Sequence, residues 1–175
     1  DLGALGRSGH IRCEAARSTW LWFTDEKNSS IWTGVASGLA SLSRVLRETP
    51  LQSSMDTLAR KTFSDIAARV GWKHKKGDTE LEVLLRSLVL AEAGKYGVKE
   101  VVAHARELFV AHAVRNKELP ADIRAAVYQT VARSGGKKEF DLFLTLLKKA
   151  TLQEEQNRIQ RAIVCFSDPK LLQQI

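Results

Sequence analysis

Apolar residues recur every three or four positions along almost the whole chain, and this spacing constrains the fold more than any other feature of the sequence. Such spacing places apolar side chains on one face of an α-helix. No stretch alternates apolar and polar residues for long enough to predict a strand, and only 3 prolines interrupt the chain. The predicted helices cover residues 11–23, 30–47, 53–70, 79–91, 98–112, 120–134, 138–149, 151–166 and 169 onward. We therefore expect an all-α protein of about nine helices.

Short polar motifs predict where several of these helices begin. Residues Thr79–Glu82 have the register of a capping box, and Thr151–Glu154 have the same register. Ser53 is expected to cap the third helix. The fourth helix, residues 79–91, is apolar nearly all round, so we expect it to lie at the centre of the fold.

The length and composition suit one domain. The chain has 175 residues and 44% hydrophobic content, which is enough to bury a core. Helices joined by short turns pack antiparallel, and a succession of such hairpins forms a bundle or a solenoid. We expect residues 1–175 to form a single helical domain, arranged as a HEAT- or armadillo-like α-solenoid. The abrupt start at Asp1 and the end at Ile175 lead us to expect a fragment of a longer chain.

The chain is basic, with a formal net charge of +7 and a pI of about 9.6, so an acidic partner has to be considered. Its tightest basic clusters are residues 73–76 and Lys137-Lys138, and both stand at predicted turns without interleaved aromatic side chains. A binder of single-stranded nucleic acid needs such aromatic platforms. We therefore predict a solvated basic surface and no nucleic-acid partner. No apolar run is long enough to span a bilayer, so no membrane span is expected.

The sequence predicts no catalytic residues and no metal ligands in this chain. A zinc peptidase needs two histidines one helical turn apart, with a glutamate beside the first as general base. The histidines are His10, His74, His104 and His112. No pair among them has that spacing, and none is followed by glutamate. Cys13 and Cys165 lie at opposite ends of the chain, which predicts no disulfide framework and fits a reducing compartment.

Several segments nevertheless share their order and spacing with a known family. They are residues 31–32, 71–72, 84–86, 119–128, 131–136, 154–159 and 167–172. Together they resemble the late C-terminal domain of the puromycin-sensitive and endoplasmic-reticulum zinc aminopeptidases, which are gluzincins. The sequence departs from that pattern at Lys137-Lys138 and at residues 10–13, so the resemblance does not fix the subfamily.

The resemblance implies a non-catalytic domain of an enzyme that removes N-terminal residues from peptides. In that family the zinc ligands and the general base lie in an earlier domain, so no cofactor and no activity are expected from this chain alone. The domain would cap the active-site cavity and help to gate and bind the substrate. Its expected partners are its own catalytic domain and the peptide. The expected localisation is cytoplasmic, with the endoplasmic-reticulum lumen as the alternative.

Two arginines are candidate substrate-binding residues under this interpretation. The hypothesis is that the concave face of the cap attracts the C-terminal carboxylate of a peptide through Arg124 and Arg133. The alternative for each is an arginine that forms hydrogen bonds between helices. For the whole chain, the alternative function is a free-standing helical-repeat scaffold for protein–protein interaction, which the same fold permits.

Overall fold

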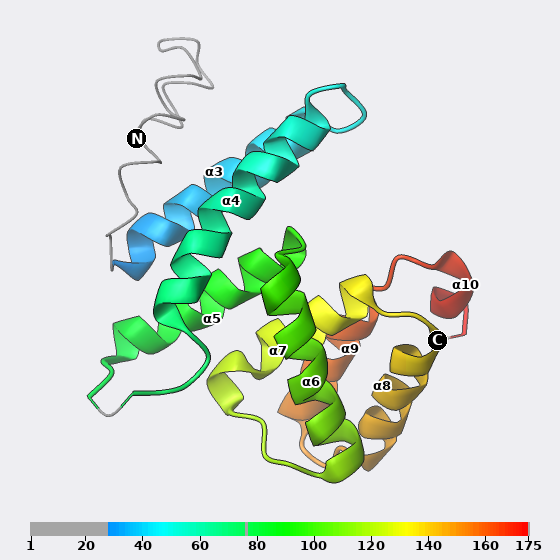
Figure 1. The fold of residues 1–175 in the computed structure, drawn as a ribbon. Coiled ribbons are helices and arrows are strands. Elements are labelled where there is room, and N and C mark those ends of the chain that lie inside the picture. Colours follow the sequence, from blue (N-terminus) through cyan, green and yellow to red (C-terminus); the bar gives the residue numbers. More distant parts are fainter. Residues whose placement is uncertain (1–27, 76, 175) are drawn as a thin grey trace.

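The computed structural model describes residues 28–75 and 77–174, and within these ranges every regular element is a helix (Figure 1). The helices are α3 (Ser29–Val45), α4 (Gln52–Val70), α5 (Glu80–Lys95), α6 (Lys99–Arg115), α7 (Ala121–Ser134), α8 (Lys137–Lys149), α9 (Gln153–Ile163) and α10 (Pro169–Leu172). They confirm the all-α prediction and correspond to the predicted helices from residue 30 onward. The predicted helix of residues 11–23 lies outside the described residues.

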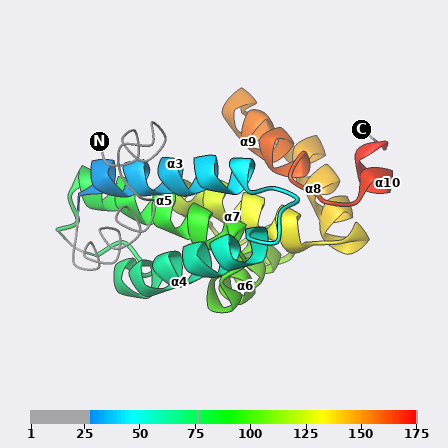
Figure 2. The ribbon, with the colours of Figure 1, turned by 90° about the horizontal axis from the view of Figure 1, so that it is seen from above.

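The helices are arranged in an α-solenoid-like array. Helix α3 contacts α5, α5 contacts α7 and α7 contacts α9, so alternate helices form a continuous row. Helices α4 and α6 lie together on one side of that row (Figure 2). As predicted, α5 is central, because it contacts α3, α4, α6 and α7. Among the described helices, none combines the length and apolar character needed to cross a bilayer.

Aromatic side chains mark two parts of one continuous core. In the first part the ring of Phe63 stacks on Tyr96, with centroids 5.9 Å apart, and Trp32 lies 6.1 Å from Phe63. In the second part Phe109 packs 4.5 Å from Phe143 and Tyr128 meets Phe143 edge-on at 5.6 Å. These contacts join α3, α4 and α5 at one end of the row and α6, α7 and α8 at the other. Such pairs add to the free energy gained by burying the rings.

The helix starts show which local predictions the structure bears out. The Thr79–Glu82 capping box is present, with Glu82 N–H donating to Thr79 Oγ1 at 3.3 Å and Thr79 N–H donating to Glu82 Oε2 at 2.8 Å. The Ser53 cap is wrong, because the preceding turn continues into α4 through Leu51, which already has helical backbone angles. The Thr151–Glu154 box is also wrong, since α9 begins at Gln153 and Leu152 is its N-cap residue.

Candidate functional site

Both candidate arginines lie on α7, but on opposite sides of it. They are nine residues apart, and a helix turns 100° per residue, so their side chains diverge by about 180° and are separated by about 13 Å along the axis. Arg124 faces α9 and is partly buried, whereas Arg133 is exposed. The two side chains therefore cannot hold one carboxylate together, and each has to be considered by itself.

Arg124 connects the loop before α7 to α9. Its Nε and Nη2 atoms donate to the carbonyl oxygen of Leu119 at 3.2 and 2.7 Å, and its Nη1 atom donates to Glu155 Oε2 at 3.0 Å. The planar guanidinium group suits this double role, because its donors are held in a fixed fork. Arg124 thus makes the inter-helix bonds that were the alternative to substrate binding, and about a quarter of its side chain stays exposed.

Glu155 is the acceptor around which this cluster is built. It receives bonds from Arg124, from Arg158 and from the hydroxyl of Tyr128, which lies 2.8 Å from Oε1. Burial by itself raises the pKa of Glu155, but the bonds from Tyr128 and Arg124 and the charges of Arg124 and Arg158 together hold that pKa below its ordinary value. Burial also raises the pKa of the Tyr128 hydroxyl, and its bond to the carboxylate raises it further. The carboxylate is therefore ionised and the phenol neutral near pH 7.

A groove of about 310 Å³ runs along the exposed edge of this cluster, between the start of α7 and the turn that joins α8 to α9. Arg124, Arg158 and Lys149 contribute positive charge to its lining, and Glu154 and Glu155 contribute negative charge. Lys149 is exposed and has no ion-pair partner among the described residues. Its cation is therefore available to an anion in the groove. Sequence reasoning missed Lys149 because only the chain reversal after α8 brings it beside Arg124.

Arg133 does not line this groove. It is exposed in the last turn of α7, and within the described part of the chain it has no hydrogen-bonded or ionic partner. A cation at a helix C-terminus also offsets the negative end of the helix dipole. The structure thus places one candidate arginine in a charged groove and leaves the other isolated on the opposite side of the same helix.

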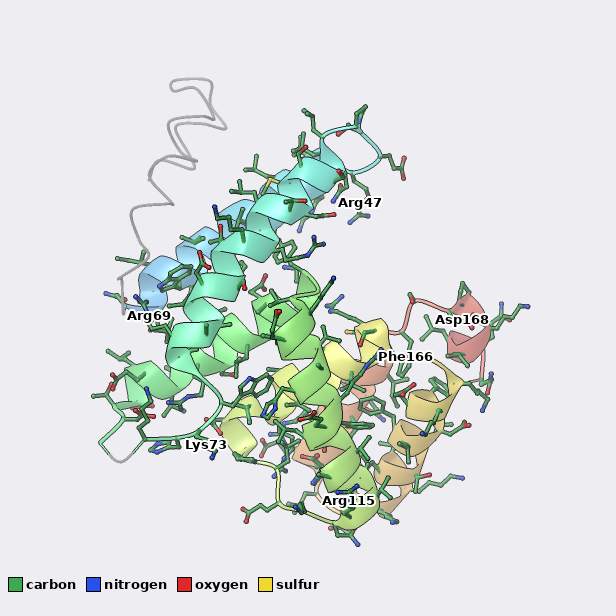
Figure 3. All side chains as sticks on the ribbon, viewed as in Figure 1. Arg47, Arg69, Lys73, Arg115, Phe166 and Asp168 are labelled. Atoms are coloured by element: carbon green, nitrogen blue, oxygen red, sulfur yellow. The ribbon has the colours of Figure 1, made fainter. Side chains whose placement is uncertain are left out.

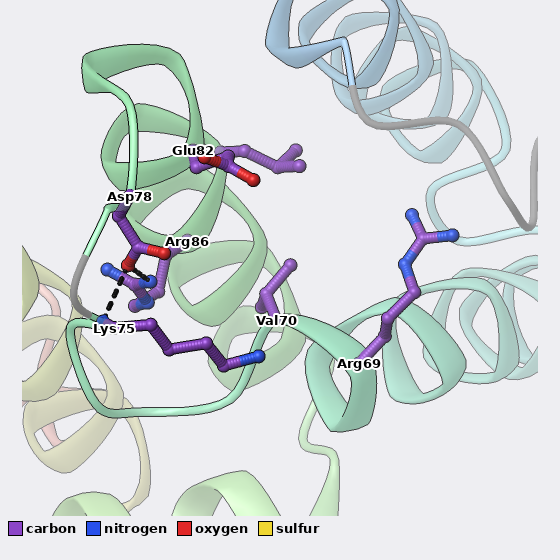
Figure 4. A pocket seen from close by; sticks show the side chains of 7 residues that line it. Arg69, Val70, Lys75, Asp78, Glu82 and Arg86 are labelled. Atoms are coloured by element: carbon purple, nitrogen blue, oxygen red, sulfur yellow. Dashed lines mark hydrogen bonds and ion pairs between the residues drawn. The ribbon is translucent and has the colours of Figure 1, made fainter.

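A buried charged cluster that the sequence did not predict lies at the start of α5. The side chain of Arg86 is 3% exposed and pairs with Asp78, while its Nη1 atom lies 3.6 Å from Asp122 Oδ2 on α7. The Lys75 backbone N–H donates to Asp78 at 2.8 Å, and this bond is the main reason why the pKa of Asp78 lies below its ordinary value (Figure 4). Beside it is a pocket of about 200 Å³. Arg86 joins the loop before α5 to α7, so the cluster has a clear structural role.

Two of the three histidines in the described residues, His104 and His112, have contacts that suit packing, and His74 is exposed. His104 lies 4.8 Å from the Trp72 ring and 3.3 Å from Glu107, and the His112 ring nitrogen Nδ1 lies 2.8 Å from the carbonyl oxygen of Lys117. Within residues 28–75 and 77–174, no three His, Cys, Asp or Glu side chains are grouped closely enough to hold a metal ion.

Comparison with known proteins finds one matching family model and several aminopeptidases. Residues 1–175 match the family model described as the ERAP1-like C-terminal domain. The chain is 26% identical over 178 residues to puromycin-sensitive aminopeptidase of Caenorhabditis elegans and 23% identical over 178 residues to aminopeptidase 2 of Candida albicans. Each alignment covers 100% of this chain and 19% of the relative. Aminopeptidase M1 of Arabidopsis thaliana is 30% identical over 118 residues, covering 65% of this chain and 13% of the relative.

Proposed function

Because the chain belongs to the ERAP1-like C-terminal domain family, we propose that it is the C-terminal domain of a zinc aminopeptidase that removes N-terminal residues from peptides. The observation that carries this proposal is the match over residues 1–175, together with aminopeptidase relatives that align with the whole chain. In the proposal, zinc is bound by the catalytic domain of the parent protein, and this chain contributes no residue to the chemical step. The cytoplasm, or alternatively the endoplasmic-reticulum lumen, stays the predicted compartment.

The proposed role of the domain is to cap the active-site cavity and to contact the end of the peptide far from the scissile bond. A solenoid offers a long surface with side chains from several helices, which suits contact with an extended ligand. The groove beside Arg124 supports this role, because Lys149 is an exposed cation that a peptide carboxylate can reach. Arg124 would contribute its exposed edge to the same contact. Arg133 would be a separate contact, on the other side of α7.

The carboxylate contact can be tested in the full-length protein with matched peptides that end in a free acid or in an amide. Lys149→Ala should raise KM for the acid by roughly two- to fivefold, which is the range of an exposed ion pair, and should leave KM for the amide nearly unchanged. Arg124→Ala and Arg133→Ala are measured in the same way. Lys138→Ala is the control, because Lys138 is exposed and lies outside this groove.

The result that would contradict the contact is an equal change, or no change, for acid and amide peptides in all three variants. Arg124→Ala also removes bonds to Leu119 and Glu155, so its unfolding temperature has to be measured beside its KM.

The broader proposal has its own test. The full-length protein should release the first residue of a peptide with a free α-amine and should spare the same peptide when its amine is acetylated. A chelator should abolish the release, and added zinc should restore it. If neither peptide is cleaved under conditions in which the protein is folded and loaded with zinc, the aminopeptidase assignment is wrong. This conclusion does not depend on whether the groove beside Arg124 binds a carboxylate.

A further inference from the structure

A second groove, of about 630 Å³, lies at the other end of the array from the Arg124 cluster. Its walls come from the end of α3, the turn into α4, the first half of α4 and the turn between α5 and α6. Figure 3 labels Arg47 at the turn between α3 and α4, far from Arg69 at the opposite end of the same hairpin. We call this the α3–α5 groove.

The α3–α5 groove carries an excess of positive charge. Four cations line it, from three different segments, and only two carboxylates do. The cations are Arg44, Arg47, Arg60 and Lys95, and the carboxylates are Glu48 and Asp56.

The charges of the groove are incompletely paired. Lys95 pairs with Glu92 at 2.8 Å. Arg44 and Arg47 have no ionic partner among the described residues, and Arg60 donates only through Nε, to the carbonyl oxygen of Tyr96 at 3.0 Å. The terminal nitrogens of Arg60 are therefore left for another acceptor. Arg44 and Lys95 lie in the last turns of their helices, where they offset the helix dipoles, but Arg47 and Arg60 do not.

Three buried side-chain oxygens in the lining of the same groove have no hydrogen-bond partner in the described part of the chain. They are Ser43 Oγ, Gln52 Oε1 and Tyr96 Oη. Tyr96 is only 8% exposed. A buried polar atom without a partner destabilises the folded state, so such atoms are rare and mark places where a polar group is missing. Ser43 Oγ and Tyr96 Oη can each donate a hydrogen bond to an anion, whereas Gln52 Oε1 can only accept one, so the lining suits a polar ligand accompanied by water.

We propose that the α3–α5 groove binds a compact polyanion that carries at least two carboxylate or phosphate groups. A single carboxylate would satisfy one guanidinium group and leave the others unpaired, whereas a polyanion can bridge Arg44, Arg47 and Arg60 with charge-assisted hydrogen bonds. The volume of the groove exceeds that of a small molecule such as pyrophosphate or citrate, which leaves room for water beside the buried oxygens. This site is separate from the groove beside Arg124 and does not depend on the proposed aminopeptidase function.

Isothermal titration calorimetry of the 175-residue chain with pyrophosphate and with citrate, at one fixed ionic strength, tests the proposal. We expect one-to-one binding of at least one of the two anions. Arg47→Ala should raise Kd about tenfold, which corresponds to the loss of one charge-assisted bond. Arg115→Ala is the matched control, because it removes an exposed arginine outside this groove and should leave Kd unchanged. Binding of pyrophosphate alone would identify a phosphate ligand, and binding of citrate alone a carboxylate ligand.

If the Arg47→Ala variant folds poorly, a second variant can still test whether the groove binds the anion. Tyr96→Phe removes an unpartnered hydroxyl and keeps the ring that stacks on Phe63, so the chain should fold while Kd rises several-fold. The proposal is overturned if neither anion binds at millimolar concentration. It is equally overturned if Arg47→Ala and Arg115→Ala weaken binding to the same extent, because the attraction would then come from overall charge.

Discussion

The side chain of Thr130 occupies the space in which a β-carbon on Gly94 would lie: the distance from that position to Thr130 Oγ1 is 1.8 Å. Helices α5 and α7 therefore approach each other at Gly94 more closely than any other residue at that position would allow. Gly94→Ala should lower the free energy of unfolding by about 1–3 kcal/mol, the usual range for overpacking a core. Urea denaturation of the chain at pH 7 measures this change.

A second helical glycine provides the control for that experiment. A β-carbon on Gly34 in α3 would meet no described atom within 4 Å, so Gly34→Ala should stabilise the chain by about 0.5–1 kcal/mol through helix propensity. Adding Thr130→Ala to Gly94→Ala removes two of the three closest contacts and should recover part of the loss. If Gly94→Ala and Gly34→Ala changed the free energy of unfolding equally, α5 and α7 would be too far apart at Gly94 for an added β-carbon to clash with Thr130.

The two tyrosines of the chain should respond in opposite ways to replacement by phenylalanine. The Tyr128 hydroxyl donates to Glu155 at 2.8 Å in a fully buried position, so Tyr128→Phe should destabilise the chain by roughly 1.5–3 kcal/mol, the range for a bond to a charged group. The Tyr96 hydroxyl has no hydrogen-bond partner within residues 28–75 and 77–174, so Tyr96→Phe should be neutral or stabilising in the absence of ligand. Thermal unfolding of both variants in a buffer free of polyanions compares them directly, and a larger loss for Tyr96→Phe would contradict both assignments.

Glu155 should make the chain sensitive to acid. Its pKa in the folded state lies below the ordinary value of 4.5, so its ionised form stabilises the fold above that pH, and the stabilisation is lost as the pH falls through the folded pKa. Glu155→Gln should therefore lower the free energy of unfolding at pH 7, and the difference from the wild type should shrink below pH 4.5. Urea denaturation of both proteins at several pH values measures this difference in the free energy of unfolding. Asp78 and Glu139 also have lowered pKa values, so the Glu155→Gln variant should itself keep some acid dependence. A difference that stays constant with pH would mean that Glu155 is not ionised in the cluster.

The helices were predictable because their signal is local. Each apolar face repeats within one helix, and the Thr79–Glu82 capping box depends on residues three apart. The Ser53 cap failed because the turn before α4 continues directly into the helix, and tertiary packing decides where such a turn ends. The divergence of Arg124 and Arg133 was open to prediction from their spacing of nine residues alone.

The two charged grooves could not be predicted from the sequence. Glu155 lies 31 residues from Arg124, and Arg60 lies 36 residues from Tyr96, so their contacts depend on how hairpins stack. The periodicity of apolar residues along the sequence does not predict which polar residue on one helix faces which residue on another. The resemblance to aminopeptidases predicted the family, whereas the hydrogen-bond partners of Arg124 and Arg60 could be identified only in the structure.

The buried pair of Arg86 and Asp78 should be the most sensitive ion pair among the described residues. Their side chains are 3% and 9% exposed, and Arg86 also lies 3.6 Å from Asp122. Removal of one partner leaves the other buried without compensation, so Arg86→Met should lower the free energy of unfolding by about 3–5 kcal/mol even though methionine fills a similar volume. The exposed pair of Lys137 and Asp141 provides the control, since Lys137→Ala should change stability by less than about 0.5 kcal/mol. Adding Asp78→Asn to Arg86→Met removes the uncompensated charge and should restore part of the loss, which a purely steric defect would not allow.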